Sequence, residues 1–294
     1  MATIDRRRFL AGGAVAAVGA ALAGPANAAD EEAPKAQLNL SSQDGRIPGA
    51  DLKAKVAKMA GWQMQGIEVH GGNLRNRVAE IKAALEGTPI KMSAICAGYG
   101  GCLISQDPAE RDKAVTTMRE ILGPAGELGS TGLIIVPAFN NQTTLSNKEA
   151  RPILIDLLGK LGDDAQKAGT RILMEPLNRG EAFFLRQLAD AAAICRDVNH
   201  PAICMMGDFY HMAIEETSDR GAFLSAGKYL HHIHLASRKR NLPGQDERSF
   251  VDGFRGLKEL GYRDYCSFEC GCEGDPEVEI PKSLAFLRAQ WAEA

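Results

Sequence analysis

Short apolar runs, many of them rich in β-branched residues, alternate with longer amphipathic stretches along most of the chain. The short runs predict strands and the longer stretches predict helices, and their alternation indicates repeated βα units around a parallel sheet. The eight predicted strands cover residues 37–41, 66–69, 90–97, 131–136, 171–175, 202–207, 230–235 and 265–270. The predicted helices cover residues 52–60, 74–86, 108–128, 148–168, 185–198, 215–225, 250–260 and 276–293.

Eight such units in one chain of this length predict a closed (β/α)₈ barrel, a TIM barrel, as a single domain rather than an open doubly wound sheet. Several predicted helices end at a glycine just before the next strand, as expected of a helix C-cap; these are Gly87, Gly129, Gly169 and Gly261. No glycine-rich dinucleotide loop follows the first strand, and Gly98-Tyr99-Gly100-Gly101 has no matching acidic partner. The Walker, GxSxG and HExxH motifs are also absent from the sequence, so it does not indicate those nucleotide-binding or hydrolase classes.

The N-terminal segment has the order of an export signal. Arg6-Arg7-Arg8-Phe9-Leu10 is followed by an Ala/Gly-rich run and then by Ala26-Asn27-Ala28. This order predicts a twin-arginine signal peptide over residues 1–28. The apolar run is weakly hydrophobic and shorter than the roughly 20 apolar residues that a membrane span needs. We therefore expect residues 29–294 to form the barrel domain of a periplasmic protein whose mature form has no membrane segment.

The charge of the chain limits the class of binding partner, and its cysteine content limits disulfide pairing. The formal net charge is -3, and the mature part has no long Lys/Arg run, which argues against nucleic acid or an anionic membrane and favours a small molecule. Seven cysteines are an odd number, so at least one is unpaired, and Cys270-Gly271-Cys272 lacks both the CxxC spacing and a second pair. The sequence leaves open whether the protein is a monomer or a homo-oligomer.

Four consecutive predicted strands, the fifth to the eighth, deliver an acidic or imidazole side chain to the rim where barrel enzymes keep their working residues. The four side chains are Glu175, Asp208, His234 and Glu269. Three carboxylates and one imidazole form a hard ligand set that suits Mn²⁺, Mg²⁺ or Co²⁺, with Zn²⁺ as a further alternative. Such an ion takes about six ligands, which leaves about two positions for water or for two oxygens of a hydroxyketone.

The ligands follow in the order Glu, Asp, His, Glu at intervals of 33, 26 and 35 residues, and the chain has the EPLN motif at residues 175–178, DxxH at 208–211 and HxH at 232–234. In these two respects the chain resembles the sugar phosphate isomerase/epimerase family. That family has the xylose isomerase-like TIM barrel fold, and its D-tagatose 3-epimerase branch is the nearest match. The resemblance is specific over the fourth to eighth strands and general over the first three. It implies that Glu175, Asp208, His234 and Glu269 bind a divalent metal, with Mn²⁺ as the first expectation.

The resemblance also implies a reaction. Glu175 and Glu269 would lie on opposite faces of a bound keto-sugar as an acid/base pair. Three further residues would hydrogen-bond its reacting oxygens, namely Glu181, His211 and Arg240. The chemistry agrees, because a metal bound to a carbonyl and a neighbouring hydroxyl acidifies the C–H between them and stabilises the enediolate, while two carboxylates can exchange the proton on either face.

One position departs from the family pattern. Three residues after the ligand histidine the family often has an acidic residue, whereas this chain has Ser237, followed by Arg238-Lys239-Arg240. We therefore expect the distal end of the substrate to be held differently. We interpret the basic run as solvated surface, with Arg240 as the one member that reaches the site.

Several neighbouring residues remain open between two roles. Glu68 and His70 end the second predicted strand, where a substrate contact and a buried hydrogen-bonded role are both open. His232 shares the strand face of His234, because side chains alternate with a period of two, and is a candidate to support that ligand. The aromatic residues that either wall the sugar pocket or pack in the barrel are Trp62, Tyr99, Phe139 and Phe209.

Three functions are compatible with these residues. The first is a metal-dependent isomerase or epimerase of a keto-sugar. The second is a lyase, hydratase or dehydratase acting on a 3-keto-glycoside or an inosose in the same site, and a periplasmic location favours glycosides. The third is a non-catalytic sugar-binding protein, which the presence of all four ligands disfavours. An endonuclease of the same barrel superfamily would need additional His and Asp ligands and a basic face, and the sequence shows neither.

Overall fold

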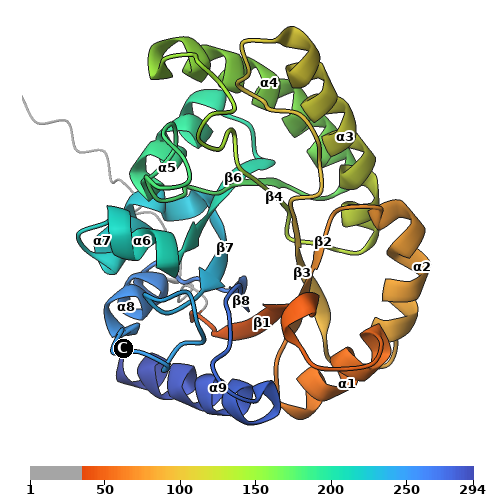
Figure 1. Cartoon of the computed structure of the whole chain (residues 1–294), viewed down its shortest axis with the longest axis vertical. Helices are drawn as coiled ribbons and strands as arrows, with labels where there is room; N and C mark the ends of the chain where they lie inside the picture. The colour runs from red at the N-terminus through yellow and green to blue at the C-terminus, as the bar shows by residue number, and fades with distance from the viewer. Residues whose placement is uncertain (1–34) are drawn as a thin grey trace, which may run out of the picture. The chain divides into compact units, whose positions relative to one another are not determined.

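The computed structural model describes residues 35–294, so the predicted signal peptide lies outside the described residues. Eight parallel strands hydrogen-bond in chain order, β8 closes back onto β1, and helices surround the barrel (Figure 1). This confirms the predicted (β/α)₈ barrel. The strands are β1 Asn39–Gln43, β2 Gly66–His70, β3 Lys91–Cys96, β4 Leu133–Ile135, β5 Ile172–Met174, β6 Ile203–Asp208, β7 Leu230–Leu235 and β8 Tyr265–Phe268.

The helices pack around the outside of the strands. The α-helices are α1 Leu52–Gly61, α2 Leu74–Leu85, α3 Pro108–Glu127, α4 Asn147–Ala168, α5 Leu188–Val198, α6 Phe209–Glu215, α7 Asp219–Ala226, α8 Val251–Glu259 and α9 Pro276–Glu293. Gly169 is the C-cap of α4 with a φ of 77°, and Gly87, Gly129 and Gly261 also have positive φ, which confirms the predicted helix ends. Among residues 35–294, no helix combines the length and the apolar character needed to cross a membrane.

The helix predicted over residues 215–225 is only partly right, because two helices, α6 and α7, lie between Phe209 and Ala226, and the first of them was not predicted. The first, α6, begins directly after β6, since Asp208 Oδ1 accepts a hydrogen bond of 2.7 Å from Tyr210 N. The second, α7, begins at a cap in which Ser218 Oγ accepts from Gly221 N at 3.0 Å. The prediction failed because Asp208 is both the last residue of a strand and the cap of the helix that follows.

The first strand was also misplaced. It runs over Asn39–Gln43 rather than residues 37–41, so the polar residues Ser42 and Gln43 belong to the strand and not to a turn. Ser41 and Gln43 share the face of β1 that points into the barrel, because side chains alternate along a strand, and the interior is polar on this side. Ser41 Oγ, for example, is 2.8 Å from Ser93 Oγ.

The interior of the barrel therefore has two sides. Buried apolar side chains fill the side made by β3 to β6; they are Ala94, Ile134, Leu173, Cys204 and Met206. Buried polar side chains fill the side made by β1, β2, β3, β7 and β8; they are Ser41, Glu68, Ser93, His232 and Ser267. Hydrogen bonds satisfy part of this set, between Ser41 and Ser93 and between Glu68 and His232, while Ser267 Oγ has no partner among the described residues. This polar side lies beneath part of the rim that carries the candidate site.

The glycine-rich segment after β3 serves packing. Gly98 has a φ of 90°, and a Cβ at this position would lie 2.2 Å from Gly72 N. The loop after β3 can therefore approach the loop after β2 only with glycine here. All seven cysteines lie within the described residues and are free thiols, so the structure pairs neither Cys270 nor Cys272.

Candidate active site

The four predicted metal ligands lie at the C-terminal ends of four neighbouring strands. Glu175 directly follows β5, Asp208 ends β6, His234 lies in β7 and Glu269 directly follows β8. The strand register pairs Asp208 with His234. One ligand-type atom from each of the four side chains lies within 4.8 Å of the others. Closure of the barrel thus brings together the residues that the sequence analysis grouped.

Three atoms in this cluster are buried and have no hydrogen-bond partner: Glu175 Oε1, Asp208 Oδ2 and His234 Nδ1. His234 Nδ1 is 3.5 Å from Glu175 Oε1 and 3.2 Å from Glu269 Oε2. A buried polar atom without a partner costs about 1–3 kcal/mol. Carboxylate oxygens and an imidazole nitrogen directed at one another are ligands for a hard divalent ion. The donor set therefore fits a divalent metal.

The carboxylate of Asp208 serves both the fold and the site. Its Oδ1 caps α6, while its Oδ2 lies among the other ligand atoms. The side chain is fully buried, and burial raises the pKa of Asp208 to about 8, with the carboxylates of Glu269 and Glu175 adding to the effect and His234 opposing it. Because a ligand carboxylate must be deprotonated, a metal ion and a proton compete for this side chain.

Burial and neighbouring charges shift the pKa values of the other three ligands in different ways. Burial would lower the pKa of His234, but the carboxylates of Glu68 and Glu269 outweigh it and raise that pKa. Burial would raise the pKa of Glu269, but the charges of His234 and Arg240 lower it to about 2. For Glu175, burial dominates and raises the pKa. Carboxylates outnumber cationic groups in this cluster, which favours a bound cation.

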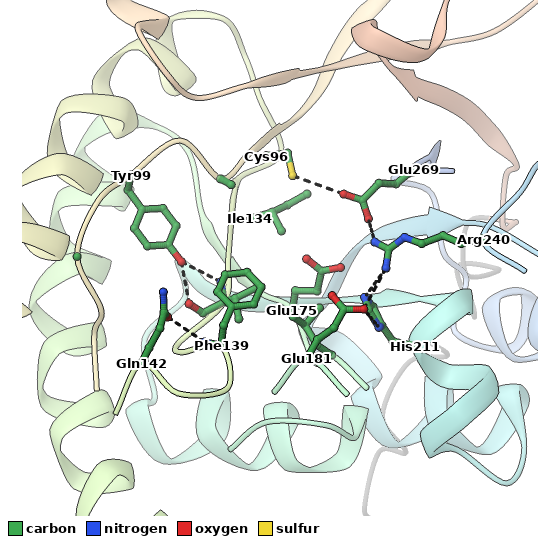
Figure 2. A pocket seen from close by; sticks show the side chains of 14 residues that line it. Cys96, Tyr99, Ile134, Phe139, Gln142, Glu175, Glu181, His211, Arg240 and Glu269 are labelled. Carbon is green, nitrogen blue, oxygen red and sulfur yellow. Dashed lines mark hydrogen bonds and ion pairs between the residues drawn. The ribbon is translucent and has the colours of Figure 1, made fainter. Parts of the chain in front are cut away.

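Arg240 links the metal cluster to the predicted substrate contacts. Its Nη2 donates to Glu269 Oε2 at 2.9 Å, and its Nη1 donates to Glu181 Oε1 at 3.4 Å. Its guanidinium also lies over the ring of Tyr210, 4.6 Å from the ring centre. In Figure 2 the guanidinium lies between Glu269 and His211.

His211 is held in one tautomer by the loop after β5. Its Nδ1 accepts from Asn178 N at 3.1 Å, which leaves the proton on Nε2. The same Asn178 donates through its side chain to Glu181 Oε1 at 3.0 Å. Burial and the neighbouring Arg240 lower the pKa of His211 to about 3, so this imidazole is neutral at neutral pH. It can therefore donate a hydrogen bond through Nε2, which is 3.6 Å from Asp208 Oδ2.

A cavity of about 240 Å³ opens beside the cluster, below the roughly 300–1,000 Å³ of drug-sized pockets, which suits a small substrate. Its polar lining consists mainly of Glu175, Glu181, His211, Arg240 and Glu269 (Figure 2). Its apolar lining includes Tyr99, Ile134, Val136, Phe139 and Leu177. The cavity thus offers hydrogen-bonding groups beside an apolar wall.

Two of the four aromatic residues considered as walls line this cavity. They are Tyr99, which bonds to the backbone of Val136, and Phe139, which is 43% exposed. Phe209 instead packs against other buried phenylalanines, and Trp62 packs against the core at the end of α1. For Trp62 and Phe209 the packing alternative holds.

Ser237 shapes the turn that carries Arg240 to the site. Its Oγ accepts from Asn241 N at 3.2 Å, and its carbonyl accepts from Arg240 N at 3.0 Å. Arg240 has a φ of 59°, a left-handed conformation that these bonds and the 2.7 Å bond from Gly271 N to its carbonyl hold in place. Arg238 and Lys239 are exposed and do not line the cavity, as predicted for surface residues.

Two residues beneath the site have roles that the sequence analysis missed or left open. Gln43 Nε2 donates to Glu269 Oε1 and to Glu68 Oε1, both at 2.9 Å. Gln43 could have been found from its position at the C-terminal end of β1, but the predicted strand ended at residue 41. Glu68 is fully buried and hydrogen-bonded, so its buried alternative holds, while His70 is exposed.

Comparison with known proteins places the chain in a family. The family described as xylose isomerase-like TIM barrel matches residues 54–290, so the chain belongs to that family. The chain is similar to 3-dehydro-D-guloside 4-epimerase of Escherichia coli (strain K12), with 29% identity over 234 residues, which cover 76% of this chain and 88% of that protein. It is also similar to D-psicose 3-epimerase of Ruminiclostridium cellulolyticum, with 25% identity over 225 residues, which cover 72% and 76% of the two chains.

A solved structure agrees with these relatives. The crystal structure of 3-keto-D-glucoside 4-epimerase from E. coli, in its apo form, superposes with a TM-score of 0.80 at 27% identity. The match covers 86% of this chain and all of that one. The relatives are therefore epimerases of keto-sugars, in agreement with the class that the motifs indicated.

Proposed function

We propose that this protein is a divalent-metal-dependent epimerase or isomerase of a keto-sugar, with Glu175 and Glu269 as its acid/base pair. The observation that carries the proposal is that both glutamates line the cavity and converge with Asp208 and His234 in one buried cluster. The names of the relatives, which include a ketose 3-epimerase and a keto-glycoside 4-epimerase, support the class of substrate.

Glu175, Asp208, His234 and Glu269 would hold the metal. Their three carboxylates and one imidazole suit Mn²⁺ first, with Mg²⁺, Co²⁺ and Zn²⁺ as alternatives. Such an ion supplies Lewis-acid polarisation of a substrate carbonyl and of the hydroxyl beside it.

The two glutamates would move the proton. One carboxylate takes it from the carbon next to the carbonyl, and the other delivers a proton to the opposite face of that carbon. Because the reaction is reversible, each glutamate acts as a base in one direction and as an acid in the other. Arg240 and neutral His211 would donate hydrogen bonds to the substrate oxygens as negative charge develops on them.

The substrate class is a small keto-sugar, either a free ketose or a 3-keto-glycoside. The polar groups of the cavity would bind the hydroxyls of the reacting ring, and the apolar wall with Phe139 would contact the rest of the molecule. A 3-keto-glycoside also offers a β-leaving group, so the same two glutamates could expel it instead of returning the proton. Epimerisation and elimination give different products.

The test is product analysis with Mn²⁺-loaded mature protein and a panel of D-psicose, L-ribulose and 3-keto-glucosides. A new stereoisomer of unchanged mass supports the epimerase, and release of an aglycone or of water supports the lyase alternative. No turnover of any member of the panel by metal-loaded protein contradicts the proposed activity. Asp208→Asn is the matched inactive control.

A further inference from the structure

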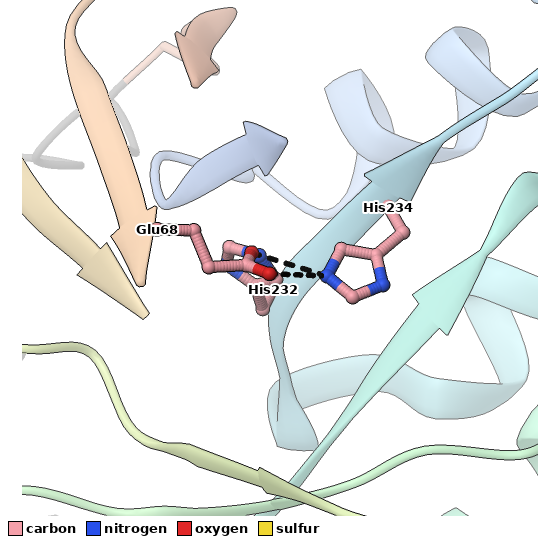
Figure 3. Close-up of side chains that lie close together, drawn as sticks. All are labelled: Glu68, His232 and His234. Carbon is pink, nitrogen blue, oxygen red and sulfur yellow. Dashed lines mark hydrogen bonds and ion pairs between the residues drawn. The ribbon is translucent and has the colours of Figure 1, made fainter. Parts of the chain in front are cut away.

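A buried carboxylate that the proposed reaction does not use lies next to the ligand His234. Glu68, in β2, points across the interior of the barrel to two histidines of β7 (Figure 3). Its Oε2 is 2.8 Å from His232 Nε2 and 3.1 Å from His234 Nε2. All three side chains are fully buried, and Glu68 does not line the cavity.

We propose that Glu68 is a positioning residue that fixes the tautomer of His234, so that Nδ1 of this histidine is the atom that binds metal. The inference rests on the metal centre of the proposed function. A metal-bound imidazole is neutral and carries one N–H, and Glu68 Oε2 is placed to accept that N–H from Nε2. Nδ1, which lies 3.5 Å from Glu175 Oε1 and 3.2 Å from Glu269 Oε2, is then the ring nitrogen left for the metal once it has lost its proton. Metal-binding histidines commonly donate their other N–H to such an acceptor.

The position requires a carboxylate rather than an amide. Three N–H donors converge on Glu68, from Gln43, His232 and His234. A carboxylate can accept from all three, whereas a glutamine of the same shape has one acceptor oxygen and would turn its own N–H groups toward at least one donor. Glu68→Gln therefore opposes the His234 tautomer while it changes the packing volume little.

The same carboxylate acts on a second ligand. Gln43 bridges Glu68 Oε1 and Glu269 Oε1, with both contacts at 2.9 Å. A change at Glu68 therefore disturbs the support of two of the four ligands, His234 and Glu269.

The atoms of Glu68, His232 and His234 also lie close enough to hold an ion themselves. The structure favours hydrogen bonds, because 2.8 Å and 3.1 Å are ordinary hydrogen-bond distances between a ring nitrogen and a carboxylate oxygen. A metal ion here would moreover share His234 with the first site through its other ring nitrogen.

The first test is calorimetric titration of metal-free mature protein with Mn²⁺, combined with elemental analysis. We expect one ion per chain in the wild type and an affinity about 10–100-fold weaker in Glu68→Gln. Glu68→Asp keeps the charge and should recover part of the loss. The control is Asp219→Asn, which removes a carboxylate paired with buried Arg248 at 2.8 Å outside the site and should keep the wild-type affinity.

The second test needs no substitution at Glu68. In ¹⁵N-histidine-labelled wild type loaded with Zn²⁺, we expect the His234 signal, assigned by its loss in His234→Ala, to show a protonated Nε2 and a metal-bound Nδ1. Metal on Nε2 overturns the inference, as does a folded Glu68→Gln variant with wild-type Mn²⁺ affinity. Two ions in the wild type and one in Glu68→Gln overturn it in favour of a second metal site. If Asp208→Asn also binds Mn²⁺ like the wild type, the proposed metal centre itself is wrong.

Discussion

In Asp208 and Glu269, the two oxygens of one carboxylate have different partners. Asp208 uses Oδ1 to cap α6 and leaves Oδ2 for the cluster, while Glu269 accepts from Gln43 with Oε1 and from Arg240 with Oε2. Each oxygen is thereby aimed before any substrate arrives. Such preorganisation lowers the cost of ordering the site at the moment of reaction.

Asp208→Asn tests this division of tasks. The asparagine keeps an oxygen that can cap α6, so we expect the variant to fold. It removes one of three anionic ligands and should weaken metal affinity by at least about tenfold, so that the protein loses its ion on gel filtration in metal-free buffer. Elemental analysis after gel filtration gives the occupancy. The control is Asp264→Asn, which removes the same charge beside His231, away from the cluster. Full occupancy in Asp208→Asn would show that the ion binds elsewhere.

At the scale of elements, the loop between β5 and α5 carries Glu181 and Asn178 to the cavity. Glu215 of α6 anchors this loop through Arg179. The carboxylate of Glu215 accepts hydrogen bonds from the backbone N, the Nε and the Nη2 of Arg179. The side chain of Glu215 is 3% exposed, whereas that of Arg179 is 64% exposed, so only the carboxylate side of this ion pair is buried.

Glu215→Ala should therefore weaken substrate binding without removing metal. Loss of the anchor frees the loop, and we expect KM to rise about tenfold, equivalent to about 1.4 kcal/mol, while metal occupancy stays unchanged. Steady-state kinetics and elemental analysis together measure the effect. Glu259→Ala, which removes a similar Arg–Glu pair on the surface of α8, is the control. An unchanged KM would mean that the loop is held by its other contacts.

The strands also show how much could be predicted from sequence. Glu175, Asp208, His234 and Glu269 could be grouped because parallel strands of a closed barrel end at one rim, so sequence position alone placed them together. Gln43 and the partners of Glu68 could not be assigned, because their roles depend on which side chains meet across the barrel interior. Helix α6 was missed because its cap, Asp208, is also the end of a strand, and α7 was started too early because the predicted helix included its cap, Ser218.

For the whole molecule, a bound ion would connect the ends of four neighbouring strands and should stabilise the folded chain. A ligand at 100 times its Kd adds about 2.7 kcal/mol, which for a domain of this size corresponds to a Tm shift of about 5–10 °C. We expect a chelator to lower the Tm of the wild type by that amount and to leave Asp208→Asn nearly unchanged. Differential scanning calorimetry measures both. An equal shift in the two proteins would show that the chelator acts elsewhere.

Export also concerns the whole molecule, and we propose it from Arg6-Arg7-Arg8 and the Ala26-Asn27-Ala28 site. Replacement of Arg6 and Arg7 by lysine should leave full-length precursor in the cytoplasm, whereas the wild type should be found in the periplasm and should begin at residue 29. Cell fractionation and N-terminal sequencing distinguish these outcomes, with Arg75→Lys as a control outside the signal. Uncleaved, soluble wild type in the cytoplasm would contradict the proposal.

The central claim is that Glu175 and Glu269 exchange a proton with the carbon next to a substrate carbonyl. The most direct measurement is incubation of a turned-over keto-sugar with metal-loaded protein in D₂O, followed by NMR and mass spectrometry. We predict deuterium at that carbon, and a loss of exchange of about 10²–10⁴-fold in Glu175→Gln and in Glu269→Gln. Turnover without deuterium at that carbon, or wild-type exchange in the double Gln variant, would contradict the account.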